Sequence, residues 1–403
     1  LKYTLTMLTI SNKGRLMPES PIRKLVPYAE KAKKNGVKVF HLNIGQPDIE
    51  TPYSAIKAVK NSDIKVLAYS KSEGDFKLRN KICDYYSKIN IEINESQVIV
   101  TSGASEALLF TIGSIMDPGN EIIIPEPFYA NYNGFSVANG VNIIPIFSSI
   151  DNNFELPKIQ EFENLISSNT KAILICNPNN PTGYVYSYDE IKTLVEIVKK
   201  HNLFLIADEV YREFTYDNVS HTSILQFDDI KQHAIVIDSV SKRYSMCGAR
   251  IGCIISKNSE FISTAMKFAQ ARLSPPTLAQ IASTAAMDTG EDYFNKVINE
   301  YNDRRKTLVE GLNEIPGVKV SEPKGAFYCV VELPVNNSEH FAKWLLEEYS
   351  LNQETIMVAP AAGFYSTPNI GQNQVRIAYV LNQSDLKSCI NILKNGLMEY
   401  LKQ

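Results

Sequence analysis

The sequence has few features that would take it outside the ordinary class of globular proteins. Tryptophan occurs once, and the six cysteines are scattered without a CxxC pair. This cysteine pattern argues against a zinc site or a redox motif and favours buried thiols in a reducing compartment. The formal net charge is only −3, so we expect neither nucleic acid nor an anionic membrane as a partner.

Long hydrophobic runs, internal repeats and low-complexity tracts are also missing. Residues 1–15 contain no continuous apolar segment, so the N-terminus resembles neither a signal peptide nor a membrane span. We therefore expect a cytoplasmic protein. A chain of 403 residues is too long for one ordinary core, which predicts two domains. We place an N-terminal arm and part of the small domain at 1–52, a large domain at 53–295 and a small C-terminal domain at 296–403.

The large domain alternates short apolar runs with amphipathic helical patterns. This alternation predicts the α/β class, with a mostly parallel seven-stranded sheet covered by helices. In such sheets the ligand lies beyond the carboxyl ends of the strands. The predicted strands are Val98–Val100, Glu121–Ile124, Asn142–Ile146, Ala172–Ile175, Leu203–Ile206, Ala234–Ile237 and Ile251–Ile255.

The C-terminal part has a different pattern. A charged helical stretch covers Glu291–Asn313, and strand-like runs follow at Phe327–Leu333 and Val375–Val380. Helices are predicted around Trp344 and from Ser384 onward. Strands followed by helices indicate a smaller α+β domain.

The most informative segment is Ser239–Arg243, which is followed by Arg250. It places Lys242 among hydroxyl groups directly after a predicted strand. Such a lysine can bond an aldehyde carbon while the hydroxyls and Arg250 hold a phosphate, and these are the requirements of an enzyme that uses pyridoxal phosphate. The alternative for Lys242 alone is a solvated surface lysine.

Asp208 and Tyr211 follow another apolar run. A carboxylate at the end of a buried strand is costly unless it is paired, and a protonated pyridine nitrogen is a suitable partner for Asp208. The alternative is an N-cap for a following helix. Tyr211 is positioned to donate a hydrogen bond to the phenolic oxygen of the cofactor, or else is an ordinary core aromatic residue.

The loop Asn177–Gly183 contains two X-Pro bonds and a glycine, which restrict its backbone. Such a loop suits holding the Asn180 amide against a flat ring, although the same residues are common in plain turns. Gly103, Ala104 and Ser105 join a predicted strand to a predicted helix. Free N–H groups at a helix start attract phosphate, but this signal is weak alone. Tyr129 follows another strand and is suited to stacking on a planar cofactor.

These motifs, in this order, resemble the class I/II aminotransferases of pyridoxal phosphate fold type I. The resemblance extends from Asn43–Asp48 to Val375–Ile377 and includes spacings of 28 residues from Asn180 to Asp208 and 34 from Asp208 to Lys242. It implies a homodimer with shared active sites that moves an amino group from an L-amino acid to a 2-oxo acid by a ping-pong cycle.

The resemblance also implies a role for each motif residue. Lys242 would carry pyridoxal 5'-phosphate covalently and act as the general base, assisted by Asp208 and Tyr211. Asp208 would bind the ring nitrogen, and Tyr69 would reach the phosphate of the other subunit. The implied cofactor-binding residues are Gly103, Ala104, Ser105, Tyr129, Asn180, Asp208, Tyr211, Ser239, Lys242, Arg250 and Tyr69.

Arg376 would bind the substrate α-carboxylate through its planar fork, with help from the Gly45 backbone and from Asn180. The alternative for Arg376 alone is a surface ion pair. The run Ser20–Leu25 is similar to a bacterial subgroup of aspartate aminotransferases, so aspartate is our first expectation for the amino donor, with 2-oxoglutarate as acceptor.

One aspartate-specific branch has a lysine where this chain has Ser105, so the distal carboxylate needs another contact. Our candidate is Arg272, beside a rigid Pro-Pro turn and donated either by the same chain or by the other subunit; a solvent-facing arginine is the alternative. Two other functions stay open: a different pyridoxal phosphate reaction on the same fold, such as a β-lyase or synthase, and a binding protein without catalysis.

Overall fold

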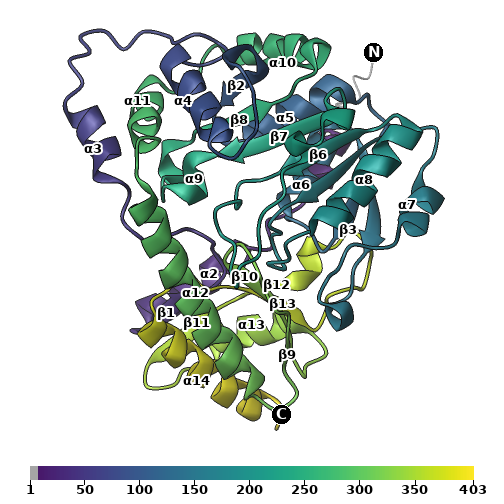
Figure 1. Ribbon diagram of the computed structural model, residues 1–403. Helices are drawn as coiled ribbons and strands as arrows, with labels where there is room; N and C mark the ends of the chain where they lie inside the picture. Colours follow the sequence, from purple (N-terminus) through teal and green to yellow (C-terminus); the bar gives the residue numbers. More distant parts are fainter. Residues whose placement is uncertain (1–7) are drawn as a thin grey trace, which may run out of the picture.

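The structure is a computed structural model that describes residues 8–403. Residues 1–7, which belong to the predicted N-terminal arm, lie outside the described part. A large sheet with its helices occupies the upper half of the view in Figure 1, and smaller sheets with their own helices occupy the lower half. Among the described residues, no helix combines the length and apolar character needed to cross a membrane.

The large sheet contains all seven predicted strands in the order β2-β8-β7-β6-β5-β3-β4. Every neighbouring pair is parallel except those of β8, which runs antiparallel to β2 and β7. The prediction of a mostly parallel sheet is therefore confirmed. The strands are β2 (Val98–Thr101), β3 (Glu121–Glu126), β4 (Asn142–Phe147), β5 (Thr170–Cys176), β6 (Phe204–Asp208), β7 (Ala234–Ser239) and β8 (Gly252–Ile255).

Helices cover both faces of this sheet, which explains why its strands are continuous apolar runs. Ile122 and Ile124 of β3 belong to one core cluster, while Ile123 between them belongs to a second cluster. This alternation follows from the two-residue period of a strand. The helices around the sheet are α4 (Phe76–Ser87), α5 (Ala104–Ile115), α6 (Asn131–Asn139), α7 (Ile159–Leu165), α8 (Tyr188–His201), α10 (Ser259–Arg272) and α11 (Thr277–Ala286).

Helix α8 shows how local sequence sets these elements. Ser187 and Glu190 form a capping box at its start, and Asn202 ends it in the left-handed conformation, as expected for such residues. Its apolar stripe, which includes Ile191 and Leu194, is buried against the sheet.

The lower region holds the C-terminal strands and part of the N-terminal segment. Strand β1 pairs in parallel with β11, and a separate antiparallel sheet has the order β12-β13-β10-β9. Helix α12 runs beside both regions (Figure 1). The domain boundaries proposed above stay a prediction. The elements are α2 (Val26–Lys34), β1 (Lys38–His41), α12 (Glu291–Asn313), β9 (Lys319–Val320), β10 (Tyr328–Glu332), α13 (Ser338–Glu347), β11 (Glu354–Met357), β12 (Ala359–Pro360), β13 (Gln374–Ala378) and α14 (Gln383–Tyr400). Helix α1 (Asn12–Leu16) instead lies beside α6 of the large-sheet region, where Lys13 donates a hydrogen bond to the Ala138 carbonyl oxygen.

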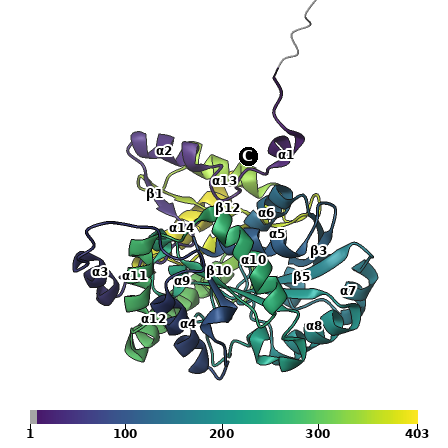
Figure 2. The same ribbon diagram turned by 90° about the horizontal axis from the view of Figure 1, so that it is seen from above.

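Helix α3 (Tyr53–Lys60) and the chain after it form an outer edge of the molecule in both views (Figures 1 and 2). Several apolar side chains of this edge are exposed, including Val66 and Leu67. Exposed apolar side chains that gather on one edge mark an interaction surface.

The strand ends place the polar motifs. The loop Asn177–Gly183 follows β5, Asp208 is the last residue of β6, and Ser239 is the last residue of β7. Because these three strands are parallel neighbours, their carboxyl ends meet at one edge of the sheet. Helix α9 (Val240–Arg243) begins there and carries Lys242.

Candidate active site

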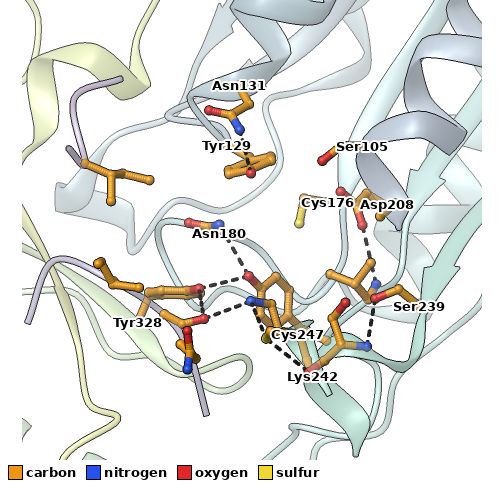
Figure 3. Close-up of a pocket in the computed structure, with 18 of the residues that line it drawn as sticks. Ser105, Tyr129, Asn131, Cys176, Asn180, Asp208, Ser239, Lys242, Cys247 and Tyr328 are labelled. Carbon is orange, nitrogen blue, oxygen red and sulfur yellow. Dashed lines mark hydrogen bonds between the residues drawn. The ribbon is translucent and has the colours of Figure 1, made fainter. Parts of the chain in front are cut away.

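A cavity of about 590 Å³ lies at the carboxyl ends of these strands, a volume within the usual range for a ligand site. Figure 3 shows side chains from the large sheet, the N-terminal segment and the lower region around it. Most residues predicted from the sequence line this cavity. They are Gly45, Ala104, Ser105, Tyr129, Asn180, Asp208, Tyr211, Ser239, Lys242, Arg250 and Arg376.

Lys242 presents a free amine to the cavity. Its Nζ donates a hydrogen bond to the Gly45 carbonyl oxygen at 2.8 Å and lies 3.7 Å from Cys247 Sγ (Figure 3). Within the described residues it forms no ion pair. Ser239 caps the short helix α9 by accepting a hydrogen bond from the Ser241 backbone N–H. The amine is therefore held in place by contacts that leave it able to form a covalent bond.

Asp208 is a buried carboxylate at the cavity wall. Tyr132 donates a hydrogen bond from its hydroxyl to Asp208 Oδ2 at 2.9 Å, and the Val210 N–H approaches Oδ1 at 3.4 Å. Burial raises the pKa of Asp208 to about 6, although both hydrogen bonds oppose that shift. No α-helix follows β6 before β7, so the alternative that Asp208 caps a helix is wrong. Because burial disfavours the ionised form of this carboxylate, a cationic or N–H partner would stabilise it.

Three polar side chains meet beside Lys242. The Tyr211 and Tyr328 hydroxyl oxygens are 2.9 Å apart, and Asn180 Nδ2 points toward the Tyr211 hydroxyl at 3.4 Å (Figure 3). Burial raises the pKa of Tyr211 well above its ordinary value, so this hydroxyl keeps its proton and can donate it in a hydrogen bond. Sequence reasoning missed Tyr328, because nothing in its strand indicates that it reaches the site.

Arg376 of β13 is buried, with 1% of its surface exposed. Its guanidinium donates to Asn180 Oδ1 at 2.9 Å and to the Asn43 carbonyl oxygen, and its Nε has no partner among the described residues. Burial lowers its pKa. The alternative of a surface ion pair is wrong, because the side chain is buried and forms no ion pair within the described part of the chain. A buried cation of this kind is stabilised by an anionic ligand.

The opposite side of the cavity is lined by Arg250 and the start of α5. Gly103 precedes α5 with a φ of +83°, and a Cβ built there would lie 2.2 Å from the Arg250 guanidinium. Only glycine therefore lets the guanidinium lie against the helix start. The first N–H groups of a helix and an adjacent arginine together form an anion-binding site.

Tyr69 and Arg272 lie away from this cavity. Tyr69 is 81% exposed on the edge that follows α3. Arg272 is half-buried and donates to Glu106 Oε2 at 2.8 Å and to the Ser72 carbonyl oxygen at 2.9 Å. The guanidinium is therefore occupied within its own chain, neither facing solvent freely nor lining the cavity. Binding of substrate by Arg272 stays a prediction, for a partner subunit only.

The family model for aminotransferase class I and II matches residues 37–393. The chain belongs to this family. It is 31% identical to the aspartate aminotransferase of Pyrococcus horikoshii over 394 residues, which cover 96% of this chain and 97% of that protein.

Solved structures agree with this membership. An aspartate aminotransferase from Thermus thermophilus with maleate has a TM-score of 0.88 at 25% identity, covering 97% of this chain and 100% of that chain. An alanine aminotransferase from Pyrococcus furiosus has a TM-score of 0.89 at 28% identity with the same coverage. Proteins of nearly the same fold are therefore named as aminotransferases of different amino acids.

Membership in the class I and II aminotransferases implies pyridoxal phosphate as the cofactor. The residues of this chain fit that molecule. The helix start with Arg250 suits a phosphate, the buried Asp208 suits a ring N–H, and Lys242 offers a free amine to the same cavity. Clusters of His, Cys, Asp and Glu that could hold a metal ion are missing from the described residues.

Proposed function

We propose that this aminotransferase binds pyridoxal 5'-phosphate covalently at Lys242 and moves the amino group of an L-amino acid, with aspartate as the leading candidate, to a 2-oxo acid such as 2-oxoglutarate. The observation that carries the proposal is the Lys242 amine, which forms no ion pair with the described residues, in one cavity with two separate anion sites, one at Arg250 and one at Arg376. Two anions are what this reaction requires, since the cofactor brings a phosphate and the substrate an α-carboxylate.

The cofactor would be held at its phosphate, its ring nitrogen, its phenolic oxygen and the face of its ring. Arg250 and the N–H groups at Ala104–Ser105 would bind the phosphate, because they form the anion site described above, and the Ser239 hydroxyl would donate to it as well. Asp208 would accept a hydrogen bond from the ring nitrogen, and Asn180 and Tyr211 would donate to the phenolic oxygen. Tyr129 would stack on the ring. Tyr132, through its hydrogen bond to Asp208 Oδ2, would orient the carboxylate.

When bound, pyridoxal phosphate supplies an aldehyde carbon that bonds to amines and a ring that accepts the electron pair of a broken Cα–H bond. Arg376 would bind the α-carboxylate and so orient the Cα–H bond of the substrate toward Lys242. Lys242 Nζ, once released by the incoming amine, would take the Cα proton and deliver it to the cofactor carbon. Gly45 helps to keep Nζ at this position, because its carbonyl oxygen accepts the Lys242 hydrogen bond. Fixed contacts at both ends supply the positioning that such proton transfers need.

A homodimer follows from the same proposal. Tyr69 and its exposed neighbours Val66 and Leu67 lie on the outer edge after α3, which a second copy would cover. In that arrangement Tyr69 would reach the phosphate of the partner's site. We also propose a cytoplasmic protein with the domain division given above.

Half-reaction spectroscopy tests the function. Mixed with an amino acid alone, the holoenzyme should convert its cofactor to the amine form, and 2-oxoglutarate should restore the original absorbance. A panel of amino donors should rank aspartate above alanine. Elimination without formation of the amine form would instead indicate a β-lyase.

A further inference from the structure

Two buried charged residues enclose the segment that carries Lys242. Asp238 precedes Ser239 near the end of β7, and Arg243 follows Lys242 at the end of α9. Both side chains are only 3% exposed, and neither lines the cavity. They therefore touch neither cofactor nor substrate in the reaction proposed above, although burying two charges is costly. Any effect of this pair on the reaction must pass through the residues that lie between its two members.

The pair connects the end of strand β7 to helix α9. Arg243 Nη2 donates to both carboxylate oxygens of Asp238, at 2.9 and 2.8 Å. Asp238 Oδ1 also accepts a hydrogen bond from the Ser239 backbone N–H at 2.7 Å. The carboxylate thus holds the backbone at the strand end and a side chain at the helix end, and Lys242 lies between these two points.

Helix α9 needs such contacts because it is very short. It has four residues, and a helix of about one turn is unstable without tertiary contacts. Ser239 caps its first end, and soon after its last residue Ser245 adopts a φ of +50°, so the helical conformation does not continue. The ion pair therefore supplies a side-chain contact at the end of α9 that its own backbone cannot extend.

Helix α4 supports the pair from outside the segment. The Tyr86 hydroxyl donates to Asp238 Oδ2 at 3.2 Å, and the Arg243 guanidinium lies 4.0 Å from the ring centre of Tyr85, close enough for a cation–π contact. Arg243 Nε also lies 3.3 Å from Glu213 Oε1, to which the Tyr85 hydroxyl donates. These contacts tie the end of α9 to α4, which belongs to the large-sheet region.

Lys242 depends on this arrangement because its own side chain is held by few contacts. Nζ donates to the Gly45 carbonyl oxygen and lies near Cys247 Sγ. A lysine side chain has many rotamers, so the direction of α9 decides which part of the cavity Nζ can reach. A displacement of about 1 Å at a reacting group can cost about 100-fold in rate.

We propose that the Asp238–Arg243 ion pair positions Lys242 for its covalent bond to the cofactor by fixing the direction of α9. This inference rests on the function proposed above, because it concerns the bond between Lys242 Nζ and the aldehyde carbon. In that step the amine nitrogen and the carbon form a C=N double bond and one water molecule leaves, so no oxidant or reductant is needed. Asp238 and Arg243 are positioning residues, since they act through Lys242.

The test compares how tightly the cofactor-free protein binds two forms of the cofactor. Pyridoxal phosphate can bond to Lys242, whereas pyridoxamine phosphate has the same ring and phosphate but no aldehyde. The ratio of the two affinities therefore measures the contribution of the Lys242 bond, and Lys242→Ala gives the ratio without it. For Arg243→Met we expect this ratio to fall about 10- to 100-fold toward the Lys242→Ala value. The affinity for pyridoxamine phosphate should stay within about threefold.

A double variant separates positioning from stability. Arg243→Met leaves the Asp238 carboxylate buried without its cation, so the thermal unfolding midpoint should fall. Adding Asp238→Asn removes that charge and keeps an oxygen for the Ser239 N–H, so the midpoint should largely recover while the affinity ratio stays low. Arg243→Lys should restore part of the ratio, because it keeps the charge without the planar fork. The double variant and Arg243→Lys also test the proposal if Arg243→Met does not fold.

Arg305→Met is the matched control. Arg305 is another buried arginine, paired with Asp217 at 2.8 Å, but it lies in α12 and does not line the cavity. Its loss should lower the unfolding midpoint and leave the affinity ratio unchanged within about twofold.

Three results would overturn the proposal: an equal loss of affinity for both cofactor forms in Arg243→Met, an unchanged ratio in that variant, or a ratio that recovers together with the midpoint in the double variant. The proposed function fails separately, if the wild-type protein forms no bond between Lys242 and pyridoxal phosphate.

Discussion

The two anion sites of the cavity use the same side chain in different surroundings. Arg250 is exposed and lies at the start of α5, whereas Arg376 is buried in β13 and stacks against Tyr328, 4.4 Å from its ring centre. Electrostatic attraction is much stronger in a buried site than beside water. We therefore expect the Arg376 site to contribute more free energy per bound anion than the Arg250 site.

The sites also differ in how the chain builds them. Arg250 donates to the Cys247 carbonyl oxygen three residues away and approaches the Ser102 carbonyl oxygen, which lies 148 positions away at the end of another strand of the same sheet. Arg376 depends on Asn180 and Asn43, which lie 196 and 333 positions away. The phosphate site is thus formed by neighbouring strand ends, while the carboxylate site exists only when the large sheet, the lower region and the N-terminal segment are packed together.

Replacing Arg376 should produce the larger effect of the two. For Arg376→Ala we expect kcat/KM for the amino acid to fall about 30- to 3000-fold, as for truncation of a buried charge pair, with cofactor affinity unchanged within about threefold. The thermal unfolding midpoint of the cofactor-free protein should change little, because removal of an unpaired buried cation offsets the loss of its hydrogen bonds to Asn180 and Asn43. A lowered midpoint with an equal loss of cofactor affinity would instead show a structural role.

Replacing Arg250 should affect the cofactor rather than the substrate. We expect Arg250→Ala to weaken binding of pyridoxal phosphate about 10- to 100-fold, measured by titrating the cofactor-free protein. At saturating cofactor the apparent KM for the amino acid should change by less than about threefold. Unchanged cofactor affinity would contradict the assignment of this end to phosphate.

The third prediction concerns Asp208, whose ionisation should have a smaller effect on cofactor affinity, and this effect should depend on pH. Burial raises the pKa of Asp208 to about 6, so its carboxylate form dominates above that pH and the neutral form below it. A protonated ring nitrogen pairs with the carboxylate form, so cofactor affinity should fall by up to about tenfold per pH unit below pH 6. The Asp208→Asn variant should bind pyridoxal phosphate more weakly at neutral pH. Its affinity should change with pH only through the ionisation of the cofactor phosphate. The same slope in Asp208→Asn would contradict the pairing.

The contrast between the two anion sites explains which features of the fold and of the site could be predicted from the sequence. The seven strands were predictable because burial on both faces makes them apolar runs, as at Ile122–Ile124. Asp208 and Lys242 were predictable because each breaks the pattern at the end of such a run. These signals are local in the sequence, and both mark the carboxyl ends of strands of the large sheet.

The remaining features depend on contacts between distant segments. Tyr132 and Tyr328 are aromatic residues in ordinary helix and strand patterns, and their roles become visible only where they meet Asp208 and Tyr211. Asn43 was part of a recognised motif, yet its contact with Arg376 has no local signal. The contact of Arg272 with Glu106 also has no local signal, since the two residues lie 166 positions apart.

The most direct test of the central claim is to locate the covalent bond to the cofactor. The holoenzyme would be treated with borohydride, digested and analysed by mass spectrometry. We predict that the reduced cofactor is attached to the Nζ of Lys242, and that Lys242→Ala carries no reduced cofactor and has no measurable transamination. Attachment to another lysine, or full transamination by Lys242→Ala, would contradict the account.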